Sequence, residues 1–307
     1  MTELLNRLRT RSWLKLGTWL GVTMAIVLLA GLGFLVYRER DTLGNYLASA
    51  NPAQLLAVVG WYTIDLMIYF VVWVAILQKL GGRTGILTHF RIFCLANASR
   101  RLPGTLWYVG GRALLYKQSD IPAKTVVIAS GIEAVVIWCS GIVAALPLVF
   151  ITRPEYVWPW SVVALGLLVA ILNPKVLRWA LLRASPEWQP GSAGLRHVYL
   201  WILGDAVGWF VGGMFLFAVL TVYQPLPLTT APSVIGAWTI AGTISMLVFF
   251  LPSNFGVTEV TLVALLSGLV PIAVAVLTAL GARILATLLD LVWGGVALLL
   301  QVGFRRQ

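Results

Sequence analysis

The segment IAVAVLTALGARILATLLDLVWGGVALLLQVG, residues 272–303, carries only two charged residues, Arg283 and Asp290. A helix rises about 1.5 Å per residue and the hydrocarbon core of a bilayer is about 30 Å thick, so about 20 apolar residues cross it. The segment is therefore predicted to be a membrane-spanning helix. The same reasoning predicts six spans, of which the fourth is short and ends at Asn173-Pro174: 13–37, 52–77, 124–151, 157–172, 197–223 and 272–303.

The composition of the whole chain agrees with a membrane protein. Sixty per cent of its 307 residues are hydrophobic, 11% are charged, and the mean hydropathy is +0.91. A soluble domain has about a quarter of its residues charged, which this chain does not approach. The net charge of +11 comes from bases that cluster between apolar runs. Bases placed there meet anionic lipid head groups, so we do not expect the chain to bind nucleic acid.

The basic N-terminus raises the alternative of a cleaved signal peptide. Arg7, Arg9, Arg11 and Lys15 precede an apolar run that extends to residue 37. This run is longer than the apolar region of a signal peptide, and no small-x-small cleavage site follows it. A retained first helix is therefore expected.

Two segments do not fit a simple span. Residues 84–117 are broken by Leu102-Pro103-Gly104 and hold His89, Arg91, Arg100, Arg101 and Arg112 before they end at Lys117. Residues 231–270 are apolar but are broken by LPSNFG at 251–256, which includes Pro252, Asn254 and Gly256.

Breaks of this kind free polar backbone groups, because proline lacks an amide donor and glycine loosens the chain. At membrane depth such groups are tolerated only inside protein or beside a wet cavity. We therefore predict that both segments are re-entrant hairpins, each built from two short helices. The residues expected at the hairpin tips are Pro103, Pro252, Asn254 and Gly256.

The distribution of Lys and Arg predicts the orientation. These residues concentrate in the N-terminus, in 79–124, in 175–196 and at 305–306, whereas the other connectors carry little or no net charge. Since cytoplasmic loops are enriched in Lys and Arg, both termini are predicted to be cytoplasmic.

With this orientation the chain divides into halves of inverted topology. The predicted fold is all-α and polytopic, a single transmembrane domain over 1–307 with repeat halves at about 13–151 and 157–303 and about eight membrane segments. Pro103 and Pro252 lie 149 positions apart, and Glu133 and Arg283 lie 150 apart. Inverted repeats with broken helices recur in transporters, where the site lies between the repeats.

Six ionisable residues fall inside predicted membrane segments: Asp65, Glu133, Asp205, Glu259, Arg283 and Asp290. A charge at the centre of a bilayer costs about 2.5–3.5 kcal/mol on insertion scales, so each needs a partner or water. They either form structural ion pairs and helix caps or line a polar path for a head group or a proton.

Residues 100–112, RRLPGTLWYVGGR, give the strongest local signal for a ligand. Arg101 and Arg112 flank the Pro-Gly break, and a helix beginning near Thr105 directs its positive end at the break. Exposed amides and guanidinium groups together suit a phosphate, which Arg can grip with two parallel hydrogen bonds. The predicted phosphate site comprises Arg101, Gly104, Trp107 and Arg112. The alternative is ordinary cytoplasmic loop charge.

The helix after the second break begins with Val257-Thr258-Glu259. Ser253 or Asn254 is a candidate cap, and an acidic residue in the first turn is stabilised by the helix dipole. A second hypothesis is that Glu259 pairs with Arg283 or Arg112.

Two further patterns concern packing and the membrane surface. Gly204, Gly208 and Gly212 lie on one helical face, which permits close approach of another helix. Residues 173–183 alternate basic and apolar residues and resemble either a short helix on the inner leaflet or a plain basic loop.

Nothing in the sequence points to a metal, a cofactor or a catalytic centre. No DxD, HExxH or GxxxxGK[ST] pattern occurs, and His89 and His197 are not in a ligand pattern. Cys94 and Cys139 lie in apolar stretches without CxxC spacing. We therefore expect no metal site, no cofactor and no enzyme activity.

A series of short motifs extends along the chain: Arg101-Leu102-Pro103-Gly104 to Gly111-Arg112, then Glu133, Leu251-Pro252, Gly256-Val257-Thr258-Glu259 and Arg283. This series resembles the transmembrane region of the lysylphosphatidylglycerol synthase family, also described as flippase-like. The resemblance extends from the first span to the last. It implies a helical bundle of the prokaryotic inner membrane that translocates lipids. This chain resembles a stand-alone member without the aminoacyl-transferase domain, so lysine transfer is not carried over.

These observations predict an ATP-independent flippase for a phospholipid or a polyprenyl-phosphate type of lipid. Glu133, Glu259 and Arg283 would switch pairing as access alternates, and Asp65 or Asp205 would carry a coupling proton. One alternative is a membrane-embedded transferase acting on a lipid. Another is a non-transporting partner subunit of a lipid or cell-envelope synthase. A homo-oligomer is also compatible with the sequence.

Overall fold

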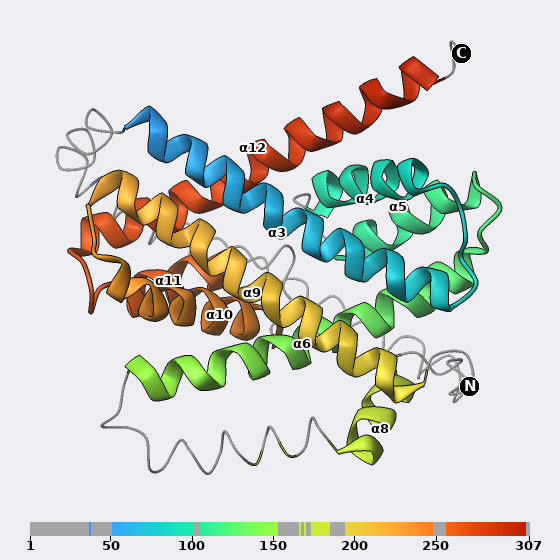
Figure 1. Cartoon of the computed structure of the whole chain (residues 1–307), viewed down its shortest axis with the longest axis horizontal. Helices are drawn as coiled ribbons and strands as arrows, with labels where there is room; N and C mark the ends of the chain where they lie inside the picture. Colours follow the sequence, from blue (N-terminus) through green and yellow to red (C-terminus); the bar gives the residue numbers. More distant parts are fainter. Residues whose placement is uncertain are drawn as a thin grey trace, which may run out of the picture.

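The computed structural model describes residues 37, 51–100, 105–152, 166, 169, 173–184, 194–247 and 256–304. Within these ranges the chain is helical, and it contains no β-strand (Figure 1). The predicted span 13–37 lies outside the described residues except for Tyr37, and 157–172 lies outside them except for Gly166 and Val169.

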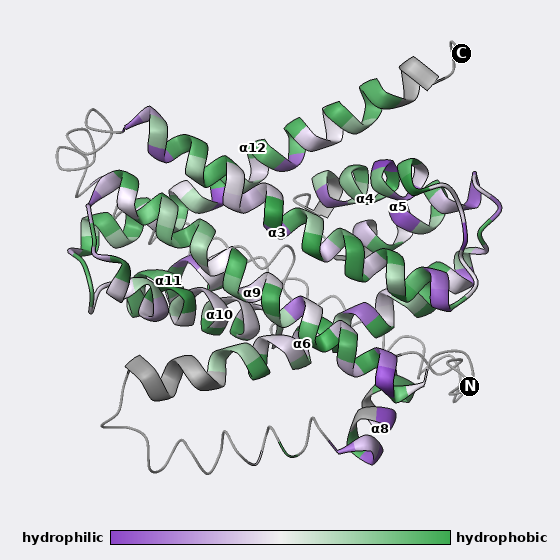
Figure 2. Cartoon of the chain, viewed as in Figure 1, coloured by the Kyte–Doolittle hydropathy of each residue, from purple (hydrophilic) through white to green (hydrophobic). Residues whose placement is uncertain are grey.

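Four long helices form the frame of the bundle: α3 (Pro52–Lys79), α6 (Ala123–Thr152), α9 (Leu195–Tyr223) and α12 (Ile272–Phe304). Each is long and apolar enough to cross a membrane, which confirms the predicted spans 52–77, 124–151, 197–223 and 272–303 as helices of that kind. Hydrophobic residues cover most of their length, whereas hydrophilic residues gather at one end of the bundle and in α8 (Figure 2). The protein is therefore a multi-pass membrane protein.

Each of the two broken segments contains two short helices, as predicted. The first pair is α4 (Ile86–Arg100) and α5 (Thr105–Lys117), and the second is α10 (Ala231–Leu247) and α11 (Val257–Leu266), preceded by the short helix η2 (Leu228–Thr230). The members of each pair pack against each other. The α4–α5 pair lies towards the right-hand end of the bundle and the α10–α11 pair towards the left-hand end (Figure 1).

The helix contacts follow a pattern that relates the two halves of the chain. Helix α5 packs on α6 as α11 packs on α12, and α4 packs on α12 as α10 packs on α6. The long helices α3 and α9 pack on each other. If α3, α4, α5 and α6 are exchanged with α9, α10, α11 and α12 in that order, these packing partners stay the same.

The contact between α3 and α9 depends on the glycine face of α9. A Cβ atom added at Gly204 would lie 2.9 Å from Val72, and one added at Gly208 would lie 3.0 Å from the ring of Tyr69. Gly212 continues the same face, beside Asp65 of α3. The predicted packing role of the three glycines is confirmed, because only the absence of side chains lets the helices approach this closely.

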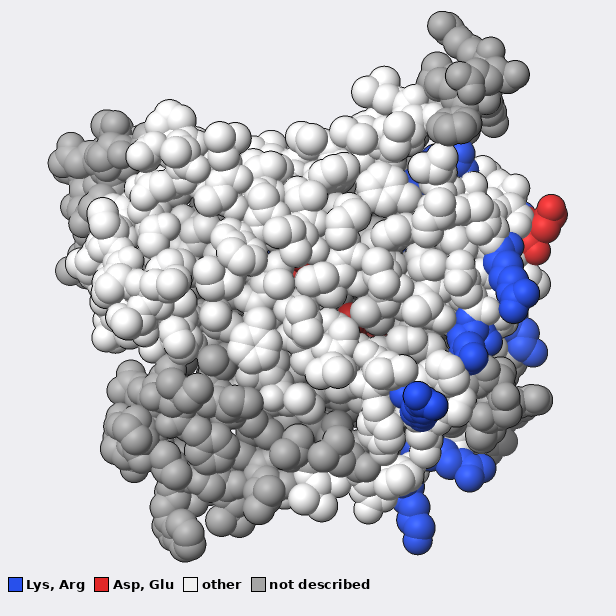
Figure 3. All heavy atoms as spheres, in the orientation of Figure 1, with Lys and Arg blue, Asp and Glu red and all other residues white. Residues whose placement is uncertain are grey.

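Positive charge gathers at one end of the molecule. Figure 3 shows Lys and Arg side chains along the right-hand edge of the visible face. The described connectors and helix ends that follow α3, flank α5 and α6 and precede α9 hold the basic residues Lys79, Arg83, Lys117, Lys124, Lys175, Arg178, Arg183 and Arg196. The connectors at the other end, 224–230 and 267–271, contain no charged residue. Helix α8 (Pro174–Ala184) is at the basic end, with Leu181 buried and Arg178 and Trp179 exposed. The helical alternative for 173–183 is thus confirmed.

A test of the packing uses two glycines in different surroundings. A Cβ added at Gly213 of α9 would lie 2.7 Å from the Cα atom of Ile235 in α10, whereas nothing lies within 4 Å of one added at Gly60 of α3. We expect Gly213→Ala to destabilise the protein by about 1–3 kcal/mol through overpacking. Gly60→Ala should be neutral or stabilise it by up to about 1 kcal/mol through helix propensity.

Thermal unfolding of the purified variants in detergent, followed by circular dichroism, measures both effects. Equal unfolding midpoints for Gly213→Ala and Gly60→Ala would contradict the close contact between α9 and α10.

Candidate functional site

A buried ion pair joins the first short-helix pair to α6. Nη1 of Arg112, on α5, donates to Oε2 of Glu133, on α6, at 2.7 Å. Arg112 is 0% exposed and Glu133 is 8% exposed. A bare charge in this apolar environment would be strongly unfavourable, so each residue offsets the cost of burying the other.

Aromatic rings enclose the guanidinium of Arg112. Its central carbon lies 3.6 Å from the ring centroid of Trp73 and 4.4 Å from that of Tyr108, whose hydroxyl also accepts a hydrogen bond from Arg112 Nη2. The ring of Phe93 lies 5.5 Å away. Rings at these distances attract a cation through their electron-rich faces.

A buried hydrogen-bond network supports these rings. Trp73 Nε1 donates to the hydroxyl of Tyr116 at 2.9 Å, and Nδ1 of His89 lies 3.0 Å from the same hydroxyl. Helices α3, α4 and α5 are therefore tied together around Arg112. Sequence reasoning missed this aromatic cage. One signal was available, since Tyr108 lies four residues before Arg112 and therefore on the same face of the helix.

The predicted phosphate site is only partly within the described residues. Arg101, Pro103 and Gly104 lie outside them, and Trp107 is a helical residue of α5 whose side chain is not among those described. Arg112 belongs to a sealed ion pair in this conformation. A phosphate would reach it only after Glu133 or the surrounding rings have moved.

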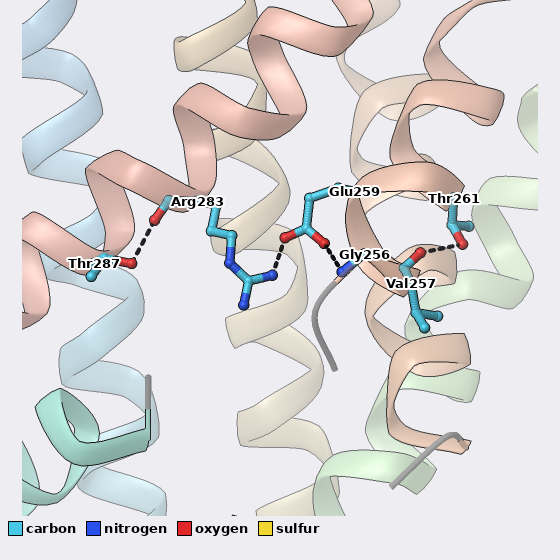
Figure 4. Close-up of polar contacts among 6 residues, drawn as sticks. All are labelled: Gly256, Val257, Glu259, Thr261, Arg283 and Thr287. Carbon is cyan, nitrogen blue, oxygen red and sulfur yellow. Dashed lines mark hydrogen bonds and ion pairs between the residues drawn. The ribbon is translucent and has the colours of Figure 1, made fainter. Parts of the chain in front are cut away.

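A second, part-buried ion pair joins the other short-helix pair to α12. Arg283 Nη1, on α12, donates to Oε1 of Glu259, on α11 (Figure 4). The other oxygen of Glu259 accepts from the backbone amide of Gly256 at 2.9 Å. Glu259 thus caps the helix and pairs with Arg283, which confirms that pairing rather than one with Arg112. Gly256, with φ of 87°, is the residue before the helix, in a conformation that favours glycine.

The predicted tip residues of the second break are only partly described. Gly256 lies at the start of α11, whereas Pro252 and Asn254 lie outside the described residues, as does Ser253. The candidate caps Ser253 and Asn254 are separated from the first helical residue, Val257, by at least Phe255 and Gly256. The capping interaction that the structure shows comes from Glu259 instead.

The two ion pairs occupy corresponding places in the helix packing. One joins α5 to α6 and the other joins α11 to α12, and these are the contacts that interchange when the two halves of the chain are exchanged. The charges are reversed, because the short helix carries the arginine in the first pair and the glutamate in the second.

Asp205 is a buried carboxylate in the middle part of α9, next to Gly204, which packs against α3. Asp205 is 1% exposed, and neither of its carboxylate oxygens has a hydrogen-bond partner within the described ranges. Asp65 and Glu133 both lie close enough to repel a negative charge on it. A Cβ added at Gly212 would lie 3.4 Å from Oδ1 of Asp65, which places this carboxylate against α9.

Asp290, the remaining candidate, is buried and accepts a hydrogen bond from the hydroxyl of Tyr62. This contact joins α12 to α3. Sequence reasoning did not identify Tyr62, because a tyrosine inside an apolar span carries no sign of its partner.

In the described part of the chain no group of three or more His, Cys, Asp or Glu side chains is arranged to hold a metal ion. Cys94 and Cys139 are buried free thiols. The site consists of two ion pairs, an aromatic cage and an unpaired carboxylate, all within the bundle. No family model matches the sequence, and a search of curated proteins gives no match either.

A double substitution tests whether the Arg112–Glu133 pair is enclosed. Arg112→Met alone leaves the Glu133 carboxylate buried without its partner, and we expect a loss of about 3–5 kcal/mol in stability. Arg112→Met combined with Glu133→Leu removes both charges and should recover much of that loss. Lys117→Met, at an exposed position of the same helix, is the matched control and should change little.

The unfolding midpoints of the purified variants in detergent are the readout. A double variant that is no more stable than Arg112→Met would show that the pair is not a mutually compensating buried interaction.

Proposed function

We propose that this protein is an ATP-independent flippase that moves a phospholipid or a lipid-linked anionic head group across the membrane. The observation that carries the proposal is the two charge-reversed ion pairs within the bundle, one on each pair of short helices. Arg112–Glu133 joins α5 to α6, and Glu259–Arg283 joins α11 to α12.

The arrangement of the helices supports an inverted repeat. The short-helix pairs lie towards opposite ends of the bundle, and the packing partners are unchanged when the halves are exchanged. In transporters with such repeats, the substrate binds between the halves and access alternates as one half moves against the other. The two predicted hairpins are then re-entrant segments that enter the membrane from opposite sides.

Each ion pair can link substrate binding to the change between the inward-open and outward-open conformations of such a transporter. Separating Arg112 from Glu133 leaves two buried charges unpaired, which is strongly unfavourable unless something replaces the lost partner. The phosphate of a lipid head group replaces the carboxylate at the arginine, because a guanidinium binds phosphate with two parallel hydrogen bonds. Arg283, whose side chain is 20% exposed, is the more accessible of the two arginines in this conformation.

The remaining parts of the proposal rest on the sequence. Its resemblance to the flippase-like transmembrane region of lysylphosphatidylglycerol synthases supports membership of that family and a prokaryotic inner membrane. Arg101, Gly104 and Trp107 are expected to complete the phosphate contacts near Arg112. The basic end of the bundle faces the cytoplasm, and both termini lie on that side.

Cysteine accessibility tests the orientation. In a background with Cys94 and Cys139 replaced by alanine, Gln118→Cys lies in the connector at the basic end and Thr229→Cys in the uncharged connector at the other end. Both native residues are exposed. We expect a membrane-impermeant maleimide to label Cys at 229 in intact cells, and Cys at 118 only after permeabilisation. The reverse pattern would contradict the proposed orientation.

Lipid translocation in proteoliposomes tests the function. Vesicles of phosphatidylethanolamine and phosphatidylglycerol containing fluorescent phosphatidylglycerol are treated with dithionite, which quenches only the outer leaflet. The protein should increase the accessible fraction without nucleotide. Arg112→Ala and Glu259→Ala should each slow translocation strongly, whereas Lys117→Ala, at an exposed position, should not.

Both site variants must elute as monodisperse protein, so that slow translocation is not mistaken for misfolding. Translocation by wild type no faster than in empty vesicles, for fluorescent phosphatidylglycerol and for a polyprenyl phosphate analogue, would overturn the proposed function.

One observation favours a second candidate, a non-transporting partner subunit of an envelope synthase. Glu133 and Glu259 are both neatly paired, as they would be in a bundle that never opens. A static bundle needs these pairs only for stability. In that case the charge-free double variant of Arg112 and Glu133 would be as functional in cells as wild type, whereas a flippase would lose transport.

A further inference from the structure

Asp205 differs in its hydrogen bonding from three other buried acidic residues. Glu133, Glu259 and Asp290 each accept a hydrogen bond from a basic or hydroxyl side chain. Asp205 lies within α9 and is equally buried, yet both of its oxygens are without a hydrogen-bond partner in the described part of the chain. Such a group needs a neutralising partner other than the side chains around it.

In the part of the chain that the structure describes, no basic side chain acts on Asp205. Helix α6 contributes Glu133, which is paired with Arg112, and α3 contributes Asp65. The lysines of these two helices, Lys124 and Lys79, lie at their ends. Helix α10 has no ionisable residue. Helix α12 meets α9 where Gly281 lies beside Tyr223, and its Arg283 and Asp290 are bonded to Glu259 and Tyr62.

The ionisable residues of α9 itself are Arg196, His197, Tyr199 and Tyr223, which lie towards its two ends, at least six positions from Asp205. The charges that act on Asp205 are therefore carboxylates, which repel rather than neutralise it. A carboxylate buried without a partner is far less stable than the neutral acid, so it binds a proton instead.

We infer that Asp205 is a proton-binding site at the interface between the two halves of the protein, protonated while this interface is closed. When α3 and α9 move apart, water reaches the carboxyl group, its O–H bond breaks, and the proton passes to water and leaves a carboxylate. The proton site stands on the geometry of Asp205. Its use as the driving ion rests on the proposed flippase function.

The location of Asp205 links protonation to movement of the halves. Helices α3 and α9 are each other's counterparts in the packing pattern, so their contact is a contact between the halves. The glycine face of α9 forms this contact, with Gly204 next to Asp205 and against Val72 of α3. Any movement of one half against the other therefore changes the surroundings of Asp205. Asp65, across the interface, adds repulsion once Asp205 is ionised.

Infrared spectroscopy tests the proton site without needing a substrate. The purified full-length protein is placed in nanodiscs of phosphatidylethanolamine and phosphatidylglycerol and titrated across neutral pH. We expect a carboxylic C=O stretching band of a protonated buried acid at pH near 7 in wild type and loss of this band in Asp205→Asn. Asp120→Asn, in the exposed turn before α6, is the matched control and should retain the band.

Asp205→Glu keeps a carboxyl group and should shift the band rather than remove it, which provides a second variant if Asp205→Asn does not fold. An unchanged band in Asp205→Asn, or no band of a protonated acid in wild type, would overturn the proton site.

Translocation with an imposed pH gradient tests coupling separately. In the fluorescent phosphatidylglycerol assay, a gradient should accelerate translocation by wild type, and Asp205→Asn should lose that acceleration. Wild-type translocation that is insensitive to the gradient would overturn proton coupling while leaving the flippase function intact. If the infrared band depends on Asp205 but the protein translocates no lipid, the result would support the proton site and overturn the proposed flippase function.

Discussion

A charged side chain inside an apolar helical bundle must be neutralised by the protein itself, because acyl chains offer neither a counter-ion nor a hydrogen bond. This constraint accounts for the polar architecture of the molecule. Arg112 is enclosed by Trp73, Tyr108 and Glu133, and Glu259 is held between Arg283 and the amide of Gly256. The short helices have a definite role in this arrangement. They carry one member of each pair into the bundle, and the long helices α6 and α12 supply the other.

The two ion pairs and Asp205 occupy different places relative to the two halves of the chain. The pairs hold each short helix to a long helix within its own half, since α5 and α6 belong to one half and α11 and α12 to the other. Asp205 lies instead on α9, which packs on α3 and α6 of the other half, and its neighbour Gly204 contacts α3. In the proposed flippase, the ion pairs would hold each half together, and the titratable group between the halves would respond to their separation.

The sequence predicted the helices well and their partners poorly, for a physical reason. Hydropathy and the Pro-Gly breaks are local properties, so they identified α3, α6, α9 and α12 and the two short-helix pairs. Glu259–Arg283 was one of two pairings considered, and the structure decides between them. Arg112–Glu133 was missed, because which faces of α5 and α6 meet depends on how the helices cross rather than on either sequence. The same holds for Tyr62 and Asp290, which lie far apart in the chain.

We propose that the charged side chains and the broken helices lie at membrane depth and are enclosed by protein. Electron cryo-microscopy of the protein in lipid nanodiscs measures this directly, since the map shows both the side chains and the two head-group layers. We expect Arg112–Glu133 and Glu259–Arg283 to lie between these layers, surrounded by helices, with the N-termini of α5 and α11 at the same depth. A map in which either pair lies at or beyond the head groups, with α5 or α11 in solvent, would contradict this proposal.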